Sequence, residues 1–403
     1  MHRYRQVYSF RPGKAENTLA FLTYYHFNNL IVEGHKVLSD RIIESVSKAL
    51  YWNILTISLE KELGSASEIP YQEFTPHYRD WFIYTIKLFR VLKTYDVDVL
   101  HILAYNKLFP TLFNKIDSIR IKSFKVILHL YFHPQLFNDL KYYPLKFILK
   151  QQMADVVLVA SKALKKYLVE NMVLPSEYIR IIYPIVPHSF FEYDYATSKK
   201  VVSQKRREYG LDESDFVVTY IGHIIPQRGI FELLKAFKEA SACISSLKLL
   251  IAHSGIVFRD LSIDYLTMLK QLIAKYGLEK KVILVGKQDL KSLYTISDIL
   301  FFGFRDSFLF TFPPLVVCEA MAAGVPFILR RSILVKELFE SFVPVPLYGN
   351  VDELTNVLCE LPDKSTALLN VSNVIRSIAV TKFHPSIILP RLLKLYYEMG
   401  SRK

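Results

Sequence analysis

Cysteine is scarce in this sequence, with only Cys243, Cys318 and Cys359 among 403 residues, and their spacing matches no metal-binding motif. This scarcity argues against a disulfide framework or a zinc site and fits a reducing compartment. Long apolar runs are missing too. No stretch of about 18 uncharged apolar residues occurs, so we predict no transmembrane helix. The basic opening stretch "MHRYRQVYSF" lacks the apolar core of a secretory signal.

Acidic residues are in the minority, because 38 Asp and Glu stand against 51 Lys and Arg, a net charge of +13. Such an excess attracts nucleotides, nucleic acids and anionic lipids alike. The cations are scattered, and no helix-turn-helix, zinc or RNA-binding signature accompanies them. A nucleic-acid-binding protein is therefore the least favoured interpretation, and we predict no nucleic-acid partner. Hydrophobic residues make up 51% of the chain, which is enough for large cores and argues against disorder.

Short apolar runs alternate with amphipathic stretches along the chain, which is typical of α/β layers with parallel strands. In the N-terminal half, strands are expected at "QVYSF", "HKVLS", "WNILTISL", "VDVLHILA", "FKVILHLYF", "ADVVLVAS" and "YIRIIYPIV". A helix is expected from about Ala15 to Glu33, ended by Gly34. The same alternation restarts at "FVVTYIG" and continues to a C-terminal helical region.

A polar, charged stretch over residues 193–215 separates these two alternating series. We therefore predict an N-terminal Rossmann-like domain over residues 1–192, a linker over 193–215, a second Rossmann-like domain over 216–380, and a C-terminal helix over 381–403 that packs back towards the first domain. The predicted fold class is α/β, with two doubly wound parallel sheets. Because ligands of such sheets bind at the carboxyl ends of strands, the expected site is a central cleft that both domains face.

The stretch "FPPLVVCEAMAAGVP", residues 312–326, predicts a short buried helix. Pro314 suits its start, since the N–H that proline lacks is one that the first turn leaves unpaired. The free amides of Leu315 and Val316 would then face an anion, with the positive end of the helix dipole behind them. Glu319 is the carboxylate of this apolar helix, and a buried carboxylate needs a partner, which ribose hydroxyls would provide. A solvated residue on the outer face is the alternative.

The stretch "IGHIIPQRGIF" joins the end of a predicted strand to the start of a helix. Open α/β sheets bind phosphate at such junctions. Gly222 allows the backbone to approach a ligand closely, and Gly229 opens the helix. Arg228 can present its guanidinium fork to a diphosphate, although a solvated surface arginine is the alternative.

In order and spacing, one set of motifs resembles the nucleotide-sugar-binding domain of retaining GT-B glycosyltransferases, the group 1 or family-four type. These motifs are "YIGHIIPQRGIFELLKAF", "LKLLIAHSG", "KVILVG", "DLKSLYTISDILFF" and "LVVCEAMAAGVPFI". The N-terminal half is similar through more generic phrases such as "ADVVLVASKALKKYL", so the resemblance covers nearly the whole chain. It implies a GT-B fold and transfer of a sugar from a UDP- or GDP-linked donor to an acceptor hydroxyl, with retention of anomeric configuration. It implies neither a cofactor nor a metal ion.

The resemblance also implies roles for donor-side residues. Gly222 and Gly229 match the glycines of the family's diphosphate motif. His223 stands where arginine is usual, and Arg228 stands where lysine is usual, so Arg228 keeps the charge that stabilises the leaving group. His223 keeps it only when protonated, which at neutral pH requires the phosphate to raise its pKa.

The family also has a spaced pair of glutamates near the donor. The ribose-contacting glutamate falls on Glu319, and the sugar-contacting one falls on Thr311. A threonine hydroxyl can hydrogen-bond a sugar, but it cannot stabilise positive charge.

The acceptor side is expected in the N-terminal half, where the family often has a histidine at a strand end near the reacting centre. His129 and His133 lie in "VILHLYFHP", and His133 is the better catalytic candidate because it follows the strand. His101 is a third candidate, and a core or cap histidine is the alternative for each. Gly13 lies in the first loop, which is usually glycine-rich in the family.

Aromatic residues beside cations recur in the N-terminal half, as in "RYRQVYSFR", "FLTYYHFNN", "SIRIKSFK" and "LKYYPLKFILKQQ". They suit a membrane–water interface, although a basic surface over an aromatic core explains them too. With the resemblance, they predict a cytoplasmic enzyme that contacts the anionic inner membrane face peripherally and acts on a glycan or lipid-linked acceptor. Because Thr311 and His223 depart from the family pattern, the alternative is a catalytically impaired, nucleotide-sugar-binding partner subunit.

Overall fold

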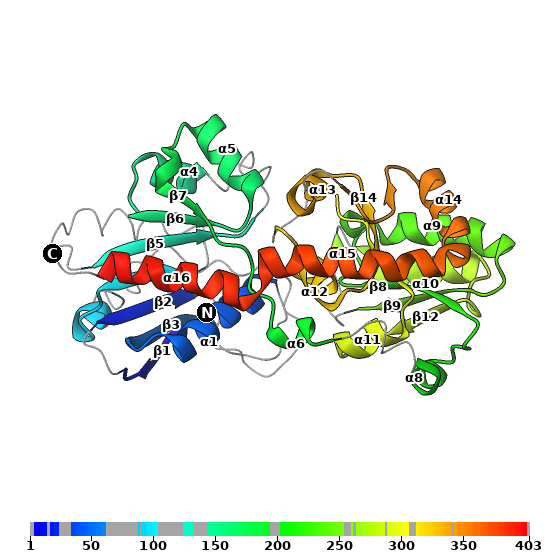
Figure 1. Cartoon of the computed structure of the whole chain (residues 1–403), viewed down its shortest axis with the longest axis horizontal. Coiled ribbons are helices and arrows are strands. Elements are labelled where there is room, and N and C mark those ends of the chain that lie inside the picture. Colours follow the sequence, from blue (N-terminus) through cyan, green and yellow to red (C-terminus); the bar gives the residue numbers. More distant parts are fainter. Residues whose placement is uncertain are drawn as a thin grey trace. The chain divides into compact units, whose positions relative to one another are not determined.

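The computed structural model describes residues 4–13, 17–23, 34–61, 88, 90–103, 124–132, 143–193, 202–253, 259–260, 263–286, 288–305, 312–339 and 342–400. The chain divides into two compact units (Figure 1). The first unit comprises Met1–Ile185 and Ile388–Lys403, and the second comprises Val186–Ile387. The division thus falls at Ile185 rather than at residue 192.

The first unit is built on a seven-stranded sheet with the order β1-β3-β2-β4-β5-β6-β7. Its strands are β1 (Tyr4–Arg11), β2 (Thr18–Thr23), β3 (Asn53–Lys61), β4 (Val99–Ile102), β5 (Lys125–Leu130), β6 (Val156–Val159) and β7 (Ile179–Ile181). Its helices are α1 (Gly34–Ala49), α4 (Tyr143–Lys150), α5 (Lys162–Met172) and most of α16 (Pro385–Gly400). All neighbouring strands are parallel except β1, which is an antiparallel edge strand beside β3.

Both faces of this first sheet are covered. Leu128 of β5 shares a core with Ile148 of α4 and Leu164 of α5. His101 of β4 lies between residues that point into this core, so its side chain is on the opposite face. There its Nδ1 lies 2.8 Å from the hydroxyl of Tyr396 on α16.

Two of the expected elements near the N-terminus are wrong. The predicted helix over residues 15–33 contains β2, whose residues are all buried, and the predicted strand "HKVLS" lies inside α1. A short, continuous apolar run is typical of both a buried parallel strand and a buried helix, so periodicity alone cannot separate them. The parallel pairing of β2 with β3 and β4 shows that this apolar run is a buried strand.

The second unit has a six-stranded parallel sheet with the order β12-β9-β8-β13-β14-β15. Its strands are β8 (Phe216–Ile221), β9 (Leu247–Ala252), β12 (Val282–Val285), β13 (Ile299–Phe302), β14 (Phe327–Arg330) and β15 (Leu347–Tyr348). A separate short pair consists of β10 (Arg259–Asp260) and β11 (Ile263–Asp264). The helices are α6 (His188–Phe191), α8 (Val202–Glu208), α9 (Ile230–Cys243), α10 (Tyr265–Lys275), α11 (Leu290–Ile296), α12 (Leu315–Ala323), α13 (Ile333–Leu338), α14 (Val351–Glu360) and α15 (Ser365–Phe383).

Helices cover both faces of this second sheet as well. Val218 of β8 packs with Leu233 of α9 and Leu354 of α14, whereas Val217 packs with Leu293 of α11. Alternate strand residues therefore contribute to two different cores, as in a doubly wound sheet. Together the two units confirm the predicted α/β class with two doubly wound sheets, apart from the antiparallel edge strand of the first.

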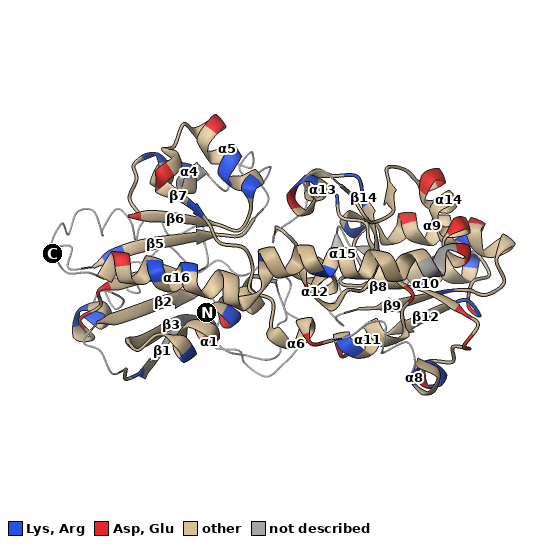
Figure 2. Cartoon of the chain, in the orientation of Figure 1, with Lys and Arg blue, Asp and Glu red and all other residues tan. Residues whose placement is uncertain are grey.

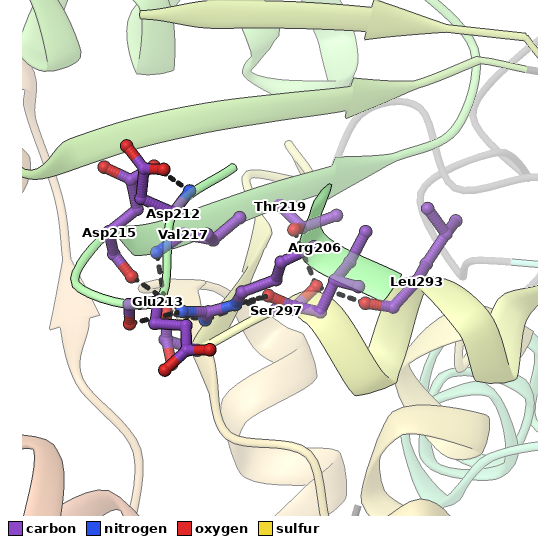
Figure 3. A network of polar contacts seen from close by, with 10 residues as sticks. Arg206, Asp212, Glu213, Asp215, Val217, Thr219, Leu293 and Ser297 are labelled. Atoms are coloured by element: carbon purple, nitrogen blue, oxygen red, sulfur yellow. Dashed lines mark hydrogen bonds and ion pairs between the residues drawn. The ribbon is translucent and has the colours of Figure 1, made fainter. Parts of the chain in front are cut away.

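Helix α8 lies within the stretch that was expected to link the domains. Its Arg206 is 4% exposed and fully engaged, as Figure 3 shows. The guanidinium donates to the carbonyl oxygens of Glu213, Asp215 and Ile296 and forms an ion pair with Asp298 at 2.6 Å. These contacts fix α8 on the second unit, beside the starts of β8 and β13.

The surface charge is spread over elements of both units. Figure 2 shows Lys and Arg on α5, α8 and α16. Within the described ranges, no helix is both long enough and apolar enough to cross a membrane.

Candidate functional site

The loop after β8 brings one arginine against a bare stretch of backbone. Gly222 follows the strand with a φ of +147°, and a side chain there would collide with Nη1 of Arg228. A short turn over Pro226–Arg228 follows, and Gly229 caps α9 with a φ of +74°. Both glycines therefore serve the geometry of this loop, because it needs a missing side chain at Gly222 and a left-handed residue at Gly229.

The loop after β13 lies directly against the loop after β8. A Cβ on Gly229 would lie 2.8 Å from the carbonyl oxygen of Gly303. The amide of Arg305 donates to the carbonyl oxygen of Gln227 at 3.0 Å. Since β8 and β13 are neighbouring parallel strands, these contacts place the two loops together at the carboxyl edge of the sheet.

Arg228 is held by neutral groups. Its guanidinium carbon lies 5.5 Å from the centre of the Phe304 ring, and it interacts electrostatically with Tyr220. The Tyr220 hydroxyl in turn donates to the carbonyl oxygen of His223. Burial lowers the pKa of Arg228 from its usual value. Over the part of the chain that the structure describes, no carboxylate pairs with this guanidinium, so it remains available to an anion.

His223 lies beside this cation and is neutral at pH 7. Burial, reinforced by the charge of Arg228, lowers its pKa from 6.5 to about 4. The predicted second cation of the loop is therefore absent until an anion compensates for Arg228.

Helix α12 begins after β13 and presents its N-terminus at the same edge of the sheet. Pro314 is its N-cap, and the carbonyl oxygen of Pro314 accepts hydrogen bonds from the amides of Val317 and Cys318 at 3.1 and 3.2 Å. The amides of Leu315 and Val316 also belong to the first turn, which has no intrahelical acceptor for them. These two N–H groups and the helix dipole favour an anion at this end.

Glu319 lies one turn further along α12 and is 4% exposed. The helix is apolar around it, and α15 covers the helix end, where a Cβ on Gly324 would lie 2.7 Å from Oγ of Ser372. A carboxylate in such surroundings needs hydrogen-bond donors. The burial expected from the apolar composition of this helix is confirmed.

The structure thus brings the donor-side candidates into two neighbouring places. Gly222, His223, Arg228 and Gly229 share the loop after β8, and Pro314, Leu315, Val316 and Glu319 share the start of α12 after β13. Thr311 and His133 lie outside the described residues. Their predicted roles stay predictions.

The acceptor-side candidates lie in the first unit. His101 and His129 are 0% and 1% exposed, so both rings are in the core of that unit. Gly13 is exposed and precedes β2, where its amide donates to Oδ1 of Asn53 at 2.8 Å. The structure therefore places these three residues in different surroundings, and their acceptor role stays a prediction.

Three residues that support the site were missed. Tyr220 and Phe304 look like ordinary core aromatics in the sequence, and no local pattern separates them from other buried rings. Glu232 looks like a solvated residue of α9. Its contacts, described below, come from residues far along the chain.

Comparison with known proteins points to a glycosyltransferase family. Residues 201–356, which include β8, α9 and the start of α12, match the family model described as Glycosyl transferases group 1. Over this stretch the chain is similar to glycosyltransferases of this family. The resemblance inferred from the motifs is therefore confirmed.

Two curated relatives are similar to about half of the chain. N-acetyl-alpha-D-glucosaminyl L-malate synthase of Bacillus anthracis is 27% identical over 214 residues, which are 53% of this chain and 48% of that protein. UDP-Gal:alpha-D-GlcNAc-diphosphoundecaprenol alpha-1,3-galactosyltransferase of Escherichia coli is 26% identical over 207 residues, which are 49% and 50% of the two chains. The matched region spans about half the length of these relatives.

Solved structures are similar over most of the chain. Anabaena Alr3699/HepE, solved with UDP and glucose, has a TM-score of 0.69 at 16% identity and covers 95% of this chain and 100% of its own. Sucrose-phosphate synthase from Thermosynechococcus elongatus has a TM-score of 0.71 at 15% identity, with coverages of 95% and 99%. At such identity the likeness shows the fold, and that fold is GT-B.

Proposed function

We propose that this protein transfers a sugar from a UDP-sugar to an acceptor hydroxyl, with retention at the anomeric carbon. The observation that carries the proposal is the guanidinium of Arg228, which pairs with no carboxylate among the described residues. It lies in the loop after β8, and α12 begins after the neighbouring strand β13. A diphosphate suits this arrangement, since it needs a fork of donors and free backbone amides. UDP is the preferred form because Alr3699/HepE was solved with UDP.

Arg228 and α12 would act on the leaving group. As the bond between the anomeric carbon and the diphosphate oxygen breaks, negative charge grows on the diphosphate. Donors fixed beforehand stabilise that charge without reorganising during the reaction. The acceptor oxygen forms its bond on the face that the leaving group departs from, and the hydroxyl proton passes to a phosphate oxygen of UDP. This is the front-face route that retention with a departing diphosphate suggests.

A lipid-linked acceptor is the finer part of the proposal. The Escherichia coli relative acts on a diphosphoundecaprenol-linked acceptor, as its name states. In the first unit, α4 carries Lys146, Phe147 and Lys150, and Phe147 is 46% exposed. An exposed aromatic ring between lysines suits an anionic membrane surface. Flotation with anionic vesicles at low salt tests this part, and a protein that stays in the soluble fraction would make a soluble acceptor the better proposal.

A donor screen tests the central proposal. Thermal shift and sugar release are measured with UDP-, GDP- and ADP-sugars, each with and without EDTA. We expect stabilisation and turnover with a UDP-sugar, and we expect EDTA to leave both unchanged because Arg228 and α12 supply the positive charge. Stabilisation without turnover on any acceptor would favour the nucleotide-sugar-binding subunit instead. No stabilisation by any nucleotide sugar would refute both.

A further inference from the structure

One carboxylate joins the ends of neighbouring strands beside the candidate donor site. Glu232 lies in the first turn of α9, and its side chain is 18% exposed. One of its carboxylate oxygens forms an ion pair with Arg305, and the other forms an ion pair with Arg330. Arg305 follows β13 and Arg330 ends β14, so a residue that follows β8 ties down both of the next two strand ends.

Each arginine is also fixed by the backbone or by a ring. The amide of Arg305 donates to Gln227 in the loop after β8. Arg330 lies 5.6 Å from the centre of the Tyr348 ring, and its Nη2 donates to the carbonyl oxygen of Gly349 at 3.3 Å. The carboxylate is therefore the shared centre of a cluster that spans the ends of β8, β13, β14 and β15.

The cluster adjoins Arg228 through Phe304. Phe304, the ring beneath Arg228, is the residue before Arg305 and is 5% exposed. Its position is set by the ion pair of Arg305 on one side and by the contact between Gly303 and Gly229 on the other. The carboxylate of Glu232 forms ion pairs with both Arg305 and Arg330, whereas Arg228 forms no ion pair with a carboxylate among the described residues.

We propose that Glu232 is a positioning residue of the donor site: through Arg305 and Phe304 it fixes the guanidinium of Arg228 where a diphosphate binds. The inference rests on the proposed function, because it takes Arg228 as the diphosphate ligand. Glu232 itself touches no substrate. Its loss should therefore weaken binding of the phosphates and leave recognition of the nucleoside unchanged.

The test compares UDP with uridine on the wild type and on Glu232→Gln, which keeps the shape of the side chain and removes its charge. We expect the dissociation constant of UDP, measured by calorimetry, to rise about tenfold, and that of uridine, measured by ligand-observed NMR, to stay the same. A merely structural role would move both together. Glu239→Gln on the exposed side of the same helix is the matched control, since Lys238, at 3.1 Å, is the one ion-pair partner of Glu239 among the described residues. Both dissociation constants should keep their wild-type values in this variant.

A second variant keeps the test decisive if Glu232→Gln does not fold. Phe304→Leu leaves the ion pairs in place and removes the ring, and it should give the same phosphate-selective loss. Where both variants fold, the double variant should lose little more than either single one, because they act along one path. Unchanged or tighter UDP binding in Glu232→Gln would overturn the inference, since the carboxylate would then be irrelevant or a competing anion. Failure of the wild type to bind UDP is a different result, which overturns the proposed function itself.

Discussion

The rings of His101 and His129 stack in the core of the first unit, with centroids 5.4 Å apart and planes inclined by 10°. The hydroxyls of Tyr396 and Tyr131 lie 2.8 and 3.1 Å from the respective Nδ1 atoms. Burial raises the pKa of both tyrosines, so their hydroxyls stay protonated, and each shares a hydrogen bond with the neighbouring Nδ1. Burial also lowers the pKa of His101 to about 3. The pKa of His129 is well below 6.5, because burial and the neighbouring His101 outweigh an opposing contact with the backbone of Ile182.

These neutral histidines predict acid sensitivity of the first unit. Below pH 6.5 the unfolded chain binds protons at both rings, whereas the folded chain keeps His101 neutral down to about pH 3. The unfolded state then carries more protons, so His101 lowers the free energy of unfolding by about 1.4 kcal/mol per pH unit as the pH drops from 6.5 towards 4. His129, whose pKa is also lowered, acts in the same direction. Urea unfolding followed by tryptophan fluorescence measures this, because Trp52 is buried in this unit.

The variant His129→Leu should reduce the slope of stability against pH, and His188→Asn is its control. His188 is an exposed histidine of the second unit, paired with Glu192 at 3.1 Å. A slope that stays at the wild-type value in His129→Leu would show that the buried pair does not control acid unfolding.

Arg206 predicts a large loss of stability in the second unit. Its side chain donates to three backbone carbonyl oxygens and pairs with Asp298 while being almost fully buried (Figure 3). Arg206→Met would leave the Asp298 carboxylate without its cation and should cost about 3–5 kcal/mol. Arg207→Met, one residue further along α8 on the exposed side, should change stability by less than about 0.5 kcal/mol. Chemical unfolding followed by circular dichroism compares the two, and equal effects would contradict the role of the network.

Arg206 also illustrates where sequence-based prediction ends. The restart of strand alternation at "FVVTYIG" predicts β8 because a continuous apolar run marks a buried parallel strand. The polar stretch before it reads as a linker, since nothing local shows that one of its arginines is buried. The partners of Arg206 are carbonyl oxygens and a carboxylate up to 92 residues away, and periodicity carries no information about such contacts.

The same limit applies to the candidate site. Gly222, Arg228 and Gly229 could be identified from one short stretch because a strand, a turn and a helix follow one another there. Glu232 could not, since its partners Arg305 and Arg330 lie 73 and 98 residues away. The order of strands in the sheet, rather than the order of residues, brings these charges together.

The contact between Gly229 and Gly303 predicts that Gly229 cannot accept a side chain. Gly229 and Gly277 both have left-handed φ values, +74° and +65°, but a Cβ on Gly277 would meet nothing within 4 Å. Gly277→Ala should therefore cost only the backbone term, about 1–2 kcal/mol. Gly229→Ala should cost about 1–3 kcal/mol more, because backbone would have to move. Unfolding free energies of the two variants measure the difference, and equal values would mean that the two loops separate easily.

The buried carboxylate of Glu319 predicts that the protein distinguishes a nucleotide with ribose hydroxyls from one without them. If its buried carboxylate accepts from ribose hydroxyls, Glu319→Ala should weaken UDP binding by about 1–3 kcal/mol. The wild type should bind UDP more tightly than 2′,3′-dideoxy-UDP, and the variant should bind both alike. Glu337→Ala is the control, since Glu337 is another buried glutamate of the same unit, at 3% exposure. A Glu319→Ala variant that still prefers UDP would refute the ribose assignment.

His223 predicts that donor binding takes up a proton. In the free protein its pKa is about 4, because burial and the charge of Arg228 oppose protonation. A bound diphosphate adds negative charge, which raises this pKa and lets the imidazole supply the second cation of the loop. Affinity for UDP-glucose should then rise as the pH falls from 7.5 to 5, since the bound state holds more protons than the free state over that range. The diphosphate of UDP-glucose binds no proton between pH 7.5 and 5. The nucleotide sugar itself therefore contributes nothing to the pH dependence of the affinity.

Calorimetry in two buffers of different ionisation enthalpy measures this uptake directly. The wild type should take up a fraction of a proton that grows as the pH falls, because more of the bound imidazole is then charged while the free one stays neutral. His223→Asn should show neither the uptake nor the pH dependence, and should match the wild-type affinity at pH 7.5, where the imidazole is largely neutral. Exposed His188→Asn should behave as the wild type does at every pH. If His223→Asn keeps the full pH dependence, another group carries the proton and His223 does not face the diphosphate.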